Sequence, residues 1–588
     1  MNRLFLVFIA LLALLPVLPT PEFWITQANY IGLSAIVAIG LVLLTGVGGM
    51  TSFGQAAFVG LGAYASSYLS TAMGVSPWLG LLAGVAVSMA VAFVLGALTM
   101  RLSGHYLPLG TIAWGLSFFF LFGNMEFLGK FDGISSIPPI ELFGHPLRAG
   151  EDIFYLIWAV VVLAVLATQN LLNSRPGRAI RALKGGVVMA EAMGARTVWL
   201  KLVCFVFAAV LASLSGWLYA HMQRSVNPTP FGLNAGIEYL FMAVIGGAGH
   251  VWGAIFGAGL VTLLKDQLQT WLPRLFGEAG NFETIVLGVL LVVLLQHARN
   301  GLWPYLAELM PRRWRRQALV QPPKQAQALP VRSRPQAGER LLVVEGARKE
   351  FGGLVAVNDM CFEVKAGEIV GLIGPNGAGK STMFNLITGV LDVTRGTVRY
   401  QGEEIQGQAS REIVRRGIAR TFQHVKLLGN MSVLENVALG AHLRGQAGVL
   451  RSMLRLNRGE EARLLAEAQR QLERVGLVHL MHEPAGSLAL GQQRILEIAR
   501  ALCCDPALLL LDEPAAGLRY KEKEALAELL ARLRSEGMSI LIVEHDMDFV
   551  MNLCDRLVVM EFGTLIAEGV PSVVQQDPAV LEAYLGGL

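Results

Sequence analysis

The sequence predicts a polytopic α-helical membrane domain followed by an α/β domain, both within one chain of 588 residues. Long apolar runs fill residues 1–300, whereas residues 341–588 alternate short apolar strands with helical segments. A glycine-rich loop directly follows one of those strands, which supports the α/β class. Hydrophobic residues make up 54% of the chain, and this excess is concentrated in the first part. The formal net charge of +4 argues neither for nor against nucleic acid as a partner.

The first part contains enough apolar sequence for many membrane spans, because one spanning helix needs about 20 mainly apolar residues. The stretch "LFLVFIALLALLPVLP" has two interpretations, a membrane anchor or the core of a signal peptide. We favour the anchor, because no small-x-small cleavage motif follows it and another apolar span begins soon after. Candidate spans begin near residues 3, 28, 53, 77, 105, 153, 199, 237 and 282.

The distribution of charge predicts the orientation of these spans. Residues 173–201 contain six basic side chains against the single acid Glu191, so the positive-inside rule places this loop in the cytoplasm. The charged residues of the segment 125–152 are mainly acids, so this segment is expected to face outward. Arginines between residues 299 and 316 place the end of the membrane domain inside. We therefore expect the N-terminus and the α/β domain to be cytoplasmic.

The stretch 237–264 has to leave and return on the same side, because the span near 199 runs outward and the span near 282 runs inward. Its middle reads "IGGAGHVWGAIFGAG", and glycine both weakens helices and allows close packing. We predict two short crossings or a re-entrant hairpin here, which gives about ten crossings. Interrupted helices often mark substrate sites, although these glycines can equally serve tight helix packing alone.

Three stretches of the membrane half resemble the permease family of branched-chain amino acid ABC importers, over nearly all of residues 25–300. They are "LLTGVGGMTSFGQAAFVGLGAYASSYL" (43–69), "SRPGRAIRALKGGVVMAEAMGARTVWLKL" (174–202) and "MAVIGGAGHVWGAIFGAG" (242–259). The resemblance implies a permease domain over residues 1–300 and a coupling helix that docks onto the ATPase. That helix falls on Val187, Val188, Met189, Ala190, Glu191, Ala192, Met193 and Gly194.

The coupling-helix segment can form a short apolar face from Val188, Met189, Ala192 and Met193 between basic flanks. The alternative is a cytoplasmic loop that only follows the charge rule. Residues 301–340 are rich in proline, glutamine and basic residues, which predicts a flexible cytoplasmic linker. We expect Arg312–Arg316 to lie against anionic membrane lipid. Nucleic acid is not expected, because no aromatic-rich platform accompanies the basic residues.

A phosphate-binding loop follows the strand "EIVGLI" and precedes the helical segment "TMFNLITGV". In such a loop, backbone N–H groups converge on phosphate oxygens, Lys380 supplies charge to the β- and γ-phosphates, and the Ser381 hydroxyl ligates Mg²⁺. The residues assigned to nucleotide binding here are Gly374, Pro375, Asn376, Gly377, Ala378, Gly379, Lys380, Ser381 and Thr382.

Four leucines, Leu508 to Leu511, predict a buried strand that ends in Asp512 and Glu513. Such a strand delivers two carboxylates to the edge of the sheet at which the phosphate loop lies. We expect Asp512 to hold Mg²⁺ through water, and Glu513 to polarise the attacking water as the catalytic residue.

The second half, residues 341–588, resembles the ATPase subunit of branched-chain amino acid ABC importers. The motifs that carry this resemblance are "FGGLVAVNDMCFEV" (351–364), "LDEPAAGL" (511–518) and "DPAVLEAYLG" (577–586). It implies that Phe351 stacks on adenine, that Gln423 senses Mg²⁺ and the coupling helix, and that His545 contacts the γ-phosphate and the water. It also implies a signature loop for the partner's ATP, formed by Leu488, Ala489, Leu490, Gly491 and Gln492.

Two departures from the family pattern concern the interface with the partner ATPase. Ala489 and Leu490 replace the common Ser-Gly of the signature loop, and Arg519 and Tyr520 replace the usual Asn and Pro after the second carboxylate motif. The lost hydroxyl removes a hydrogen bond worth ~1.5–3 kcal/mol to a charged phosphate. We therefore expect unequal ATP sites in a heteromer.

Together these features predict one permease–ATPase half of an importer that uses ATP and Mg²⁺ in the bacterial inner membrane. Branched-chain or similar hydrophobic amino acids are the expected cargo. The expected partners are a second permease, a second ABC ATPase and a periplasmic solute-binding protein, and we favour a heteromer over a homodimer. The alternatives are a urea or short-amide importer, a lipid-extracting ATPase complex, and an ATP-dependent regulator or channel.

Overall fold

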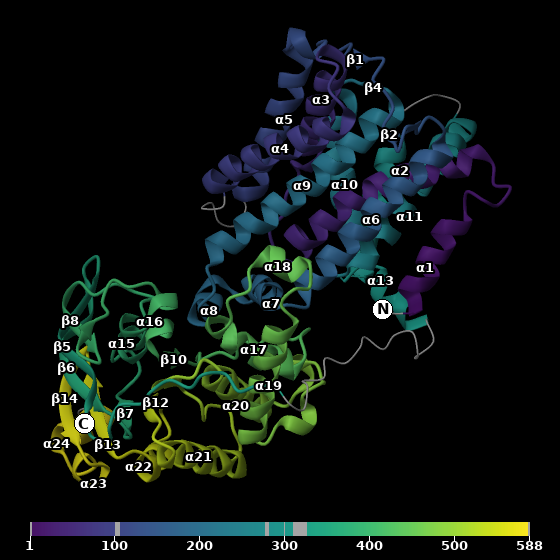
Figure 1. Cartoon of the computed structure of the whole chain (residues 1–588). Coiled ribbons are helices and arrows are strands. Elements are labelled where there is room, and N and C mark those ends of the chain that lie inside the picture. Colours follow the sequence, from purple (N-terminus) through teal and green to yellow (C-terminus); the bar gives the residue numbers. More distant parts are fainter. Residues whose placement is uncertain (1–2, 100–105, 277–281, 299, 310–325, 586–588) are drawn as a thin grey trace. The chain divides into compact units, whose positions relative to one another are not determined.

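The computed structural model describes residues 3–99, 106–276, 282–298, 300–309 and 326–585 (Figure 1). The chain forms two compact units. The first comprises Met1–Asn173 and Val198–Leu319, and the second comprises Ser174–Thr197 and Val320–Leu588. A short segment from the middle of the first half thus belongs to the second unit. The domain boundaries that we expect at residues 300 and 340 stay a prediction.

The first unit is helical, and a helix begins within about six residues of each of the nine predicted starting positions. Short 3₁₀ turns and the two-residue strands β1 (Ile134–Ser135), β2 (Glu141–Leu142), β3 (His145–Pro146) and β4 (Ser225–Val226) join some of the helices. The helices are α1 (Arg3–Leu14), α2 (Glu22–Leu41) with its continuation Val42–Val47, α3 (Gln55–Ala72), α4 (Pro77–Thr99), α5 (Tyr106–Asn124), α6 (Gly150–Leu172), α9 (Thr197–Gln223), α10 (Leu233–Gly247), α11 (Val251–Phe276), α12 (Phe282–His297) and α13 (Trp303–Leu309).

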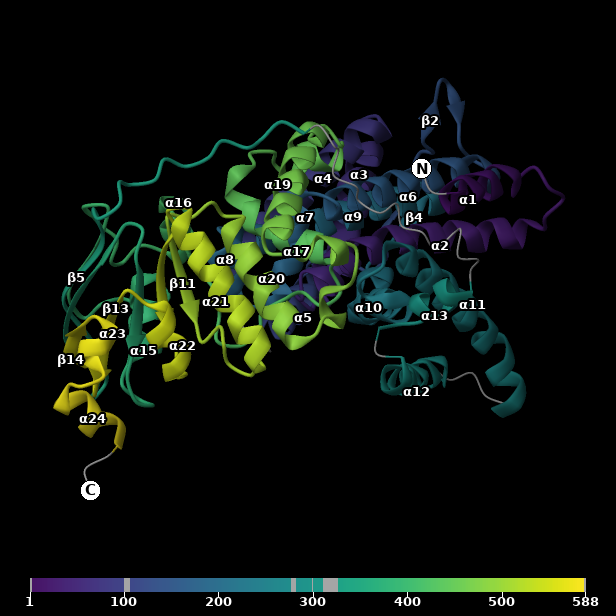
Figure 2. The same ribbon diagram turned by 90° about the horizontal axis from the view of Figure 1, so that it is seen from below.

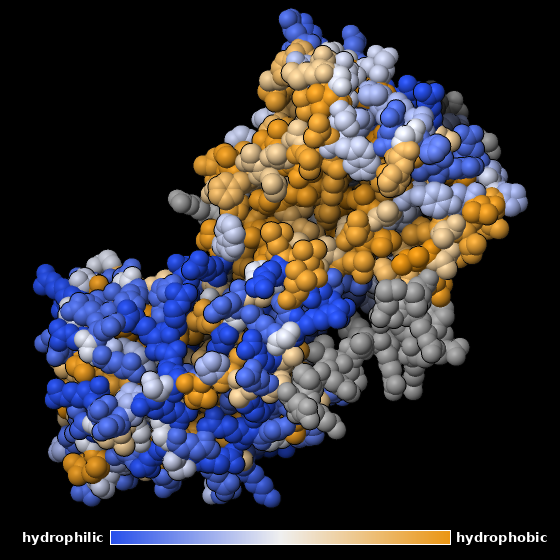
Figure 3. Space-filling model, viewed as in Figure 1, coloured by the Kyte–Doolittle hydropathy of each residue, from blue (hydrophilic) through white to orange (hydrophobic). Residues whose placement is uncertain are grey.

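Five helices in the described part of the chain are long and apolar enough to cross a membrane. They are Glu22–Val47, Pro77–Thr99, Tyr106–Asn124, Gly150–Leu172 and Thr197–Gln223. Large apolar side chains remain exposed along α4 and α5, and Figure 3 shows a broad apolar surface on this unit. An exposed apolar surface of this size fits contact with lipid. The predicted count of about ten crossings stays a prediction.

The glycine-rich stretch 237–264 consists of two helices, α10 and α11, so the predicted interruption is confirmed. The two helices lie side by side in both ribbon views (Figures 1 and 2). A Cβ atom on Gly246 would lie 1.8 Å from the carbonyl oxygen of Gly253, and one on Gly257 would lie 1.9 Å from that of Met242. These glycines therefore also permit close packing, the second role that the sequence allows. Glu238 of α10 forms an ion pair of 2.6 Å with Lys265 of α11.

The second unit is built on two sheets, which confirms the α/β class. One sheet has the strand order β10-β11-β12-β7-β13-β14, with all neighbours parallel except β13 and β14, and the other has the antiparallel order β6-β5-β8-β9. The strands are β5 (Arg340–Phe351), β6 (Leu354–Lys365), β7 (Ile369–Ile373), β8 (Arg395–Tyr400), β9 (Glu403–Glu404), β10 (Ile418–Arg420), β11 (Leu508–Asp512), β12 (Ser539–Val543), β13 (Arg556–Glu561) and β14 (Thr564–Gly569).

The three central strands β7, β11 and β12 are buried along their whole length, as expected for parallel strands that are covered on both faces. The helices of this unit are α7 (Arg175–Ala182), α8 (Val187–Ala192), α15 (Lys380–Ile387), α16 (Ser410–Arg416), α17 (Val433–Gly440), α18 (Val449–Met453), α19 (Arg458–Arg474), α20 (Leu490–Leu502), α21 (Tyr520–Ser535), α22 (Met547–Leu553), α23 (Pro571–Val574) and α24 (Pro578–Leu585). Because parallel strands end at one edge of a sheet, the segments after β7, β10, β11 and β12 meet there.

Candidate functional site

The phosphate loop connects β7 to α15 and has a backbone that requires glycine. Gly374 has φ +152°, and a Cβ atom there would lie 2.0 Å from the carbonyl oxygen of Met560. Gly379 has φ +101° and a similar clash with the carbonyl oxygen of Ala356. These contacts hold the loop in a fixed shape against β13 and β6, with Asn376 and Gly377 exposed on its outer side. Such a shape suits backbone N–H groups that point toward phosphate.

Lys380 is the first residue of α15, and its side chain folds over the phosphate loop. Its Nζ donates hydrogen bonds of 2.8 and 2.9 Å to the carbonyl oxygens of Gly374 and Pro375. Burial lowers the pKa of the Lys380 ammonium, whereas the nearby Glu513 and Asp512 carboxylates raise it. A bound polyphosphate would add negative charge beside this buried ammonium and stabilise it.

Asp512 is the last residue of β11, and its carboxylate is buried. Among the described residues, its Oδ1 atom has no hydrogen-bond partner, whereas Oδ2 lies 3.7 Å from Nη2 of Arg420. Burial raises the pKa of Asp512, while Arg420 lowers it. A buried carboxylate oxygen without a partner, on an edge that also carries the Ser381 hydroxyl, fits a site for Mg²⁺. When bound, Mg²⁺ neutralises phosphate charge.

Glu513 follows Asp512 and turns sharply away from the strand, with φ +49°. Its Oε1 accepts a hydrogen bond of 3.0 Å from Nε2 of Gln423 and lies 2.6 Å from Nε2 of His545. The structure thus brings together three predicted residues from three different strand ends. Because both contacts orient one carboxylate oxygen, the other is the oxygen that can polarise an attacking water.

The segment before Gln423 contains two residues that the sequence analysis missed. Nη1 of Arg420 donates to Oδ1 of Asn385 at 2.9 Å and to Oγ1 of Thr388 at 2.7 Å, so this guanidinium joins α15 to Asp512. The backbone N–H of Asp512 donates to the hydroxyl of Thr421 at 3.3 Å. Arg420 could have been found as an arginine on a short, buried strand, because a buried charge needs an acidic partner.

The signature loop leads into α20, and Ala489 occupies the N-cap position without a side chain that can accept a hydrogen bond. Oε1 of Gln492 accepts from the backbone N–H of Ala489 at 3.2 Å. A Cβ atom on Gly517 would lie 3.1 Å from Cδ2 of Leu490, which brings the signature loop against the loop that carries Arg519. The two departures from the family pattern therefore lie next to each other.

Phe351 ends β5 and remains half-exposed, with Nζ of Lys349 5.1 Å from its ring centre. An exposed ring of this kind can stack on a planar base. Its proposed contact with adenine stays a prediction. Leu488 is buried, Leu490 is exposed, and Gln492 is partly exposed.

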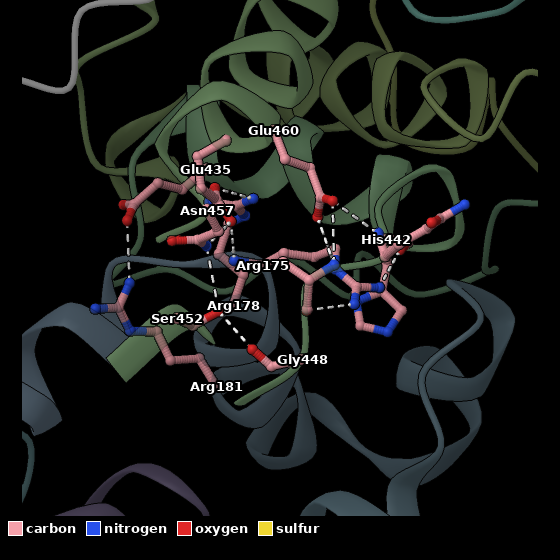
Figure 4. Close-up of polar contacts among 12 residues, drawn as sticks. Arg175, Arg178, Arg181, Glu435, His442, Gly448, Ser452, Asn457 and Glu460 are labelled. Atoms are coloured by element: carbon pink, nitrogen blue, oxygen red, sulfur yellow. Dashed lines mark hydrogen bonds and ion pairs between the residues drawn. The ribbon is translucent and has the colours of Figure 1, made fainter. Parts of the chain in front are cut away.

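The loop 174–197 packs against the ATPase domain within the second unit. Its helix α7 carries arginines three residues apart, which lie on one side of a helix and face acidic residues (Figure 4). Arg178 pairs with Glu461 at 2.8 Å, and Arg181 pairs with Glu435 at 3.0 Å. In the sequence these arginines are recognisable only as positive charge, because their partners lie more than 250 residues away along the chain.

Arg175, the third of these arginines, lies 3.7 Å from Glu460 and donates to backbone carbonyl oxygens of His442 and Ala447 at 2.7 and 2.8 Å. Burial, and then the charges of Arg175 and Arg178, lower the pKa of His442 to about 3. The neutral His442 therefore does not repel the guanidinium groups at physiological pH. We call Arg175, Arg178 and Arg181 the arginine ladder.

The predicted coupling helix is α8, which packs near α16 and α20. Met189, Ala192 and Met193 are buried as expected, but Val188 is 44% exposed and Ala190 is buried instead. The predicted apolar face is therefore wrong at Val188, because Ala190 takes its place on the side of α8 that packs inward. Gly194 has φ +84°, and a Cβ atom there would lie 2.2 Å from Leu443. Glu191 accepts a hydrogen bond from Thr197 at 2.7 Å.

Comparison with known proteins matches both halves of the chain. A family model described as the permease component of branched-chain amino acid transport systems matches residues 23–295. The ABC transporter model matches residues 357–516, and a branched-chain amino acid ATP-binding cassette transporter model matches residues 564–587. The chain is also 44% identical over 249 residues to the high-affinity branched-chain amino acid transport ATP-binding protein LivG of Salmonella typhimurium, across 98% of that protein and 42% of this chain.

The chain belongs to the branched-chain amino acid ABC transporter family. The corresponding protein BraF of Pseudomonas aeruginosa is 43% identical over 98% of its length and 42% of this chain. A solved structure of a nucleotide-free ATP-binding cassette from an ABC transporter is 35% identical to this chain, with a TM-score of 0.39. The match covers 42% of this chain and 100% of the solved chain. The resemblance that the motifs predicted is confirmed.

As a member of this ABC transporter family, the chain joins a permease domain to an ATP-binding domain. Its second unit is an ABC ATPase, whose ATP hydrolysis is coupled to transport. The permease match and the apolar helices make the chain a membrane protein. ABC importers in general work with partner subunits and a substrate-binding protein.

Proposed function

We propose that the chain is one permease–ATPase half of an importer that carries branched-chain or similar hydrophobic amino acids across the bacterial inner membrane. The observation that carries this proposal is the cluster of Gln423, Glu513 and His545 in the same unit that holds the loop 174–197. A catalytic carboxylate and a permease loop within one compact unit provide a route from hydrolysis to transport. The proposed cargo is that of the relatives LivG and BraF, which are branched-chain amino acid transport ATP-binding proteins.

In this proposal, the phosphate loop and Lys380 bind ATP, and Ser381, Gln423 and Asp512 hold Mg²⁺. Glu513 polarises the attacking water, while Gln423 and His545 fix the direction of its carboxylate. The loop 174–197 then follows the movement of the helical part of the ATPase, because the arginine ladder attaches it to α17 and α19.

The proposed assembly contains a second permease, a second ABC ATPase and a periplasmic solute-binding protein. The ATPase domain and the N-terminus face the cytoplasm, in line with the basic loop 174–197. We favour a heteromer. Ala489 leaves the signature loop of this chain, which faces the partner's ATP, without a hydroxyl. A second, different ATPase can supply a hydroxyl from its own signature loop to the ATP that this chain binds.

The test is ATP hydrolysis and leucine uptake by the assembled transporter in liposomes with its binding protein. Glu513→Gln is expected to abolish both while retaining nucleotide binding, because general-base catalysis contributes about 10²–10⁴-fold. Lys380→Ala is expected to lose nucleotide affinity as well. Normal hydrolysis by Glu513→Gln would contradict the catalytic assignment. Uptake of urea or short amides in place of leucine would correct the cargo, and hydrolysis that no binding protein stimulates would count against an importer.

A further inference from the structure

The segment between Gly448 and Asn457, which includes α18, exposes three leucines and buries two uncharged polar side chains. Leu450, Leu454 and Leu456 are 75%, 69% and 66% exposed, whereas Ser452 and Asn457 are buried. Figure 3 shows apolar side chains at the place that α18 occupies in Figure 1, on a unit whose surface is mostly hydrophilic. A soluble surface normally has the opposite arrangement, so a cluster of exposed leucines points to a contact surface.

The buried polar side chains fix this segment in place. Oγ of Ser452 donates to the carbonyl oxygen of Gly448 at 3.0 Å, and Nδ2 of Asn457 donates to Oγ of Ser452 at 3.2 Å. The carboxylate of Glu460 accepts hydrogen bonds from the backbone N–H groups of Gln446 and Ala447. The leucines are therefore presented by a hydrogen-bonded structure rather than by a loop without internal contacts.

Positive charge surrounds the leucines. Arg451, Arg455 and Arg458 are exposed, and residues 445–459 contain no acidic side chain. We call these three arginines and the three exposed leucines the leucine–arginine patch. Exposed leucines among arginines are the composition of segments that lie in the interface of an anionic membrane.

The chain itself restricts how far this patch lies from a membrane. Arg175 donates to the carbonyl oxygens of His442 and Ala447, which hold the start of the segment against α7. Arg175 follows Leu172 by three residues, and Leu172 is the last residue of α6, a helix long and apolar enough to cross a membrane. Three residues of extended chain span at most ~11 Å.

Protein partners fit the patch less well than lipid. The cytoplasmic loops of a permease are basic by the positive-inside rule, and the linker 301–340 of this chain, whose Ala326 and Gln327 line a cavity with Arg451 and Leu456 and leave Leu450 and Leu454 outside it, is basic too. Both would bring positive charge to three arginines. The phosphate headgroups of anionic lipids bring the opposite charge, and their acyl chains accept the leucines.

We propose that the leucine–arginine patch is a membrane-contact element of the ATPase domain. Its leucines insert into the surface of the membrane leaflet beside the loop 174–197, and its arginines bind the anionic lipid of that leaflet. This contact goes beyond the proposed transport function. It gives the ATPase domain a second attachment to the membrane besides the covalent one and makes its activity depend on anionic lipid.

A fluorescence experiment on the full chain tests the contact. Cys361 is the exposed cysteine of the described residues and is first changed to serine. Leu454→Cys is then labelled with a small fluorophore in nanodiscs of phosphatidylcholine with or without phosphatidylglycerol, doped with a spin-labelled lipid. Tyr520→Cys, which is also exposed and lies on α21, is the matched control.

We expect the spin-labelled lipid to quench the label at position 454 at least twofold more than the label at position 520, and only when phosphatidylglycerol is present. Arg451→Gln with Arg455→Gln is expected to remove the difference. Equal quenching at both positions would overturn the proposal. So would a label at position 454 that is shielded from water-soluble quencher in detergent, because a protein segment would then cover it.

A functional measurement separates lipid contact from folding. Arg451→Gln with Arg455→Gln is expected to hydrolyse ATP at the wild-type rate in phosphatidylcholine, but to lose at least half of the stimulation by phosphatidylglycerol. Arg463→Gln, a nearby change of the same charge outside the patch, is expected to keep that stimulation. Full stimulation in the double variant would overturn the proposal.

Discussion

Arg420 is a buried cation that joins two catalytic motifs of the ATPase domain. It contacts Asn385 and Thr388 on the helix of the phosphate loop, and it lies 3.7 Å from Asp512. Burial lowers the pKa of Arg420, and Asp512 raises it. At the scale of single residues, the position of the Asp512 carboxylate, which we propose as a Mg²⁺ ligand, thus depends on the guanidinium of Arg420.

Arg420→Gln is expected to lower kcat for ATP hydrolysis about 10–100-fold and to raise KM for Mg²⁺–ATP, because a charged contact of this kind is worth ~1.5–3 kcal/mol. Arg420→Lys retains the charge and is expected to recover part of the rate. Arg415→Gln removes the same charge from the exposed face of α16 and serves as the control. Steady-state kinetics over a range of Mg²⁺ concentrations, with melting curves for each variant, measure the effect. Unchanged kinetics in Arg420→Gln would refute the positioning role.

Ala489 occupies the N-cap position of α20 and, in the proposed assembly, faces the partner's ATP. A serine at this N-cap position can accept a hydrogen bond from the first turn of α20, which stabilises a helix start by ~1 kcal/mol. Ala489→Ser is therefore expected to raise the melting temperature by a few degrees and to increase ATP-dependent closure in the assembled transporter. The nucleotide affinity of this chain's own site is expected to stay the same. A variant with an unchanged hydrolysis rate and unchanged closure would mean that the hydroxyl is not needed.

At the scale of secondary-structure elements, α7 and α8 divide the docking of the loop 174–197 between charge and apolar contact. The ladder on α7 pairs with acids of α17 and α19, and Met189 of α8 lies near Arg500 of α20. Burial would raise the pKa of Glu435, but Arg181 and the hydrogen bonds of Ser432 outweigh it and lower the pKa. The ionised pair is therefore the favoured state over the physiological range.

Arg178→Ala is expected to uncouple hydrolysis from uptake more strongly than Arg181→Ala, because Arg178 and Glu461 are the more deeply buried pair. Basal ATP hydrolysis should remain within about twofold, while leucine uptake per ATP falls at least tenfold. Lys184→Ala, an exposed basic residue of the same loop, is the control. Uptake and phosphate release are measured in the same liposomes. Recovery of uptake in Arg178→Glu with Glu461→Arg would identify the pair itself, whereas wild-type uptake in Arg178→Ala would exclude it.

At the scale of the whole molecule, the features that could be predicted from the sequence are those formed by residues close together in the chain. The phosphate loop, Asp512 and Glu513 follow strands that an apolar run marks, and parallel strands bring their ends together. The two helices of 237–264 followed from glycine content and charge parity. The assignment of 174–197 to the second unit, the acidic partners of the arginine ladder and the role of Arg420 depend on contacts between distant segments. Such contacts leave no local pattern, and Val188 was misplaced for the same reason.

The proposed assembly contains two ATP sites, each formed by both ATPase domains. In a heteromer, this chain's phosphate loop holds one ATP beneath the partner's signature loop, and Ala489 with Leu490 faces the partner's ATP. The two ATP sites are then chemically unequal, and the intact catalytic residues of this chain serve the site that the partner closes. We expect that purification of the chain together with a second permease and a second ABC ATPase yields a complex with one copy of each.

Native mass spectrometry of the complex measures its composition, and hydrolysis by paired variants measures the inequality of its sites. Glu513→Gln in this chain is expected to abolish uptake, whereas the equivalent change in the partner ATPase is expected to reduce it only in part. A homodimer of this chain that hydrolyses ATP fully, with stimulation by the binding protein, would contradict the heteromer. It would also show that a signature loop with Ala489 can serve two equal sites, so the hydroxyl would have no essential role in closure.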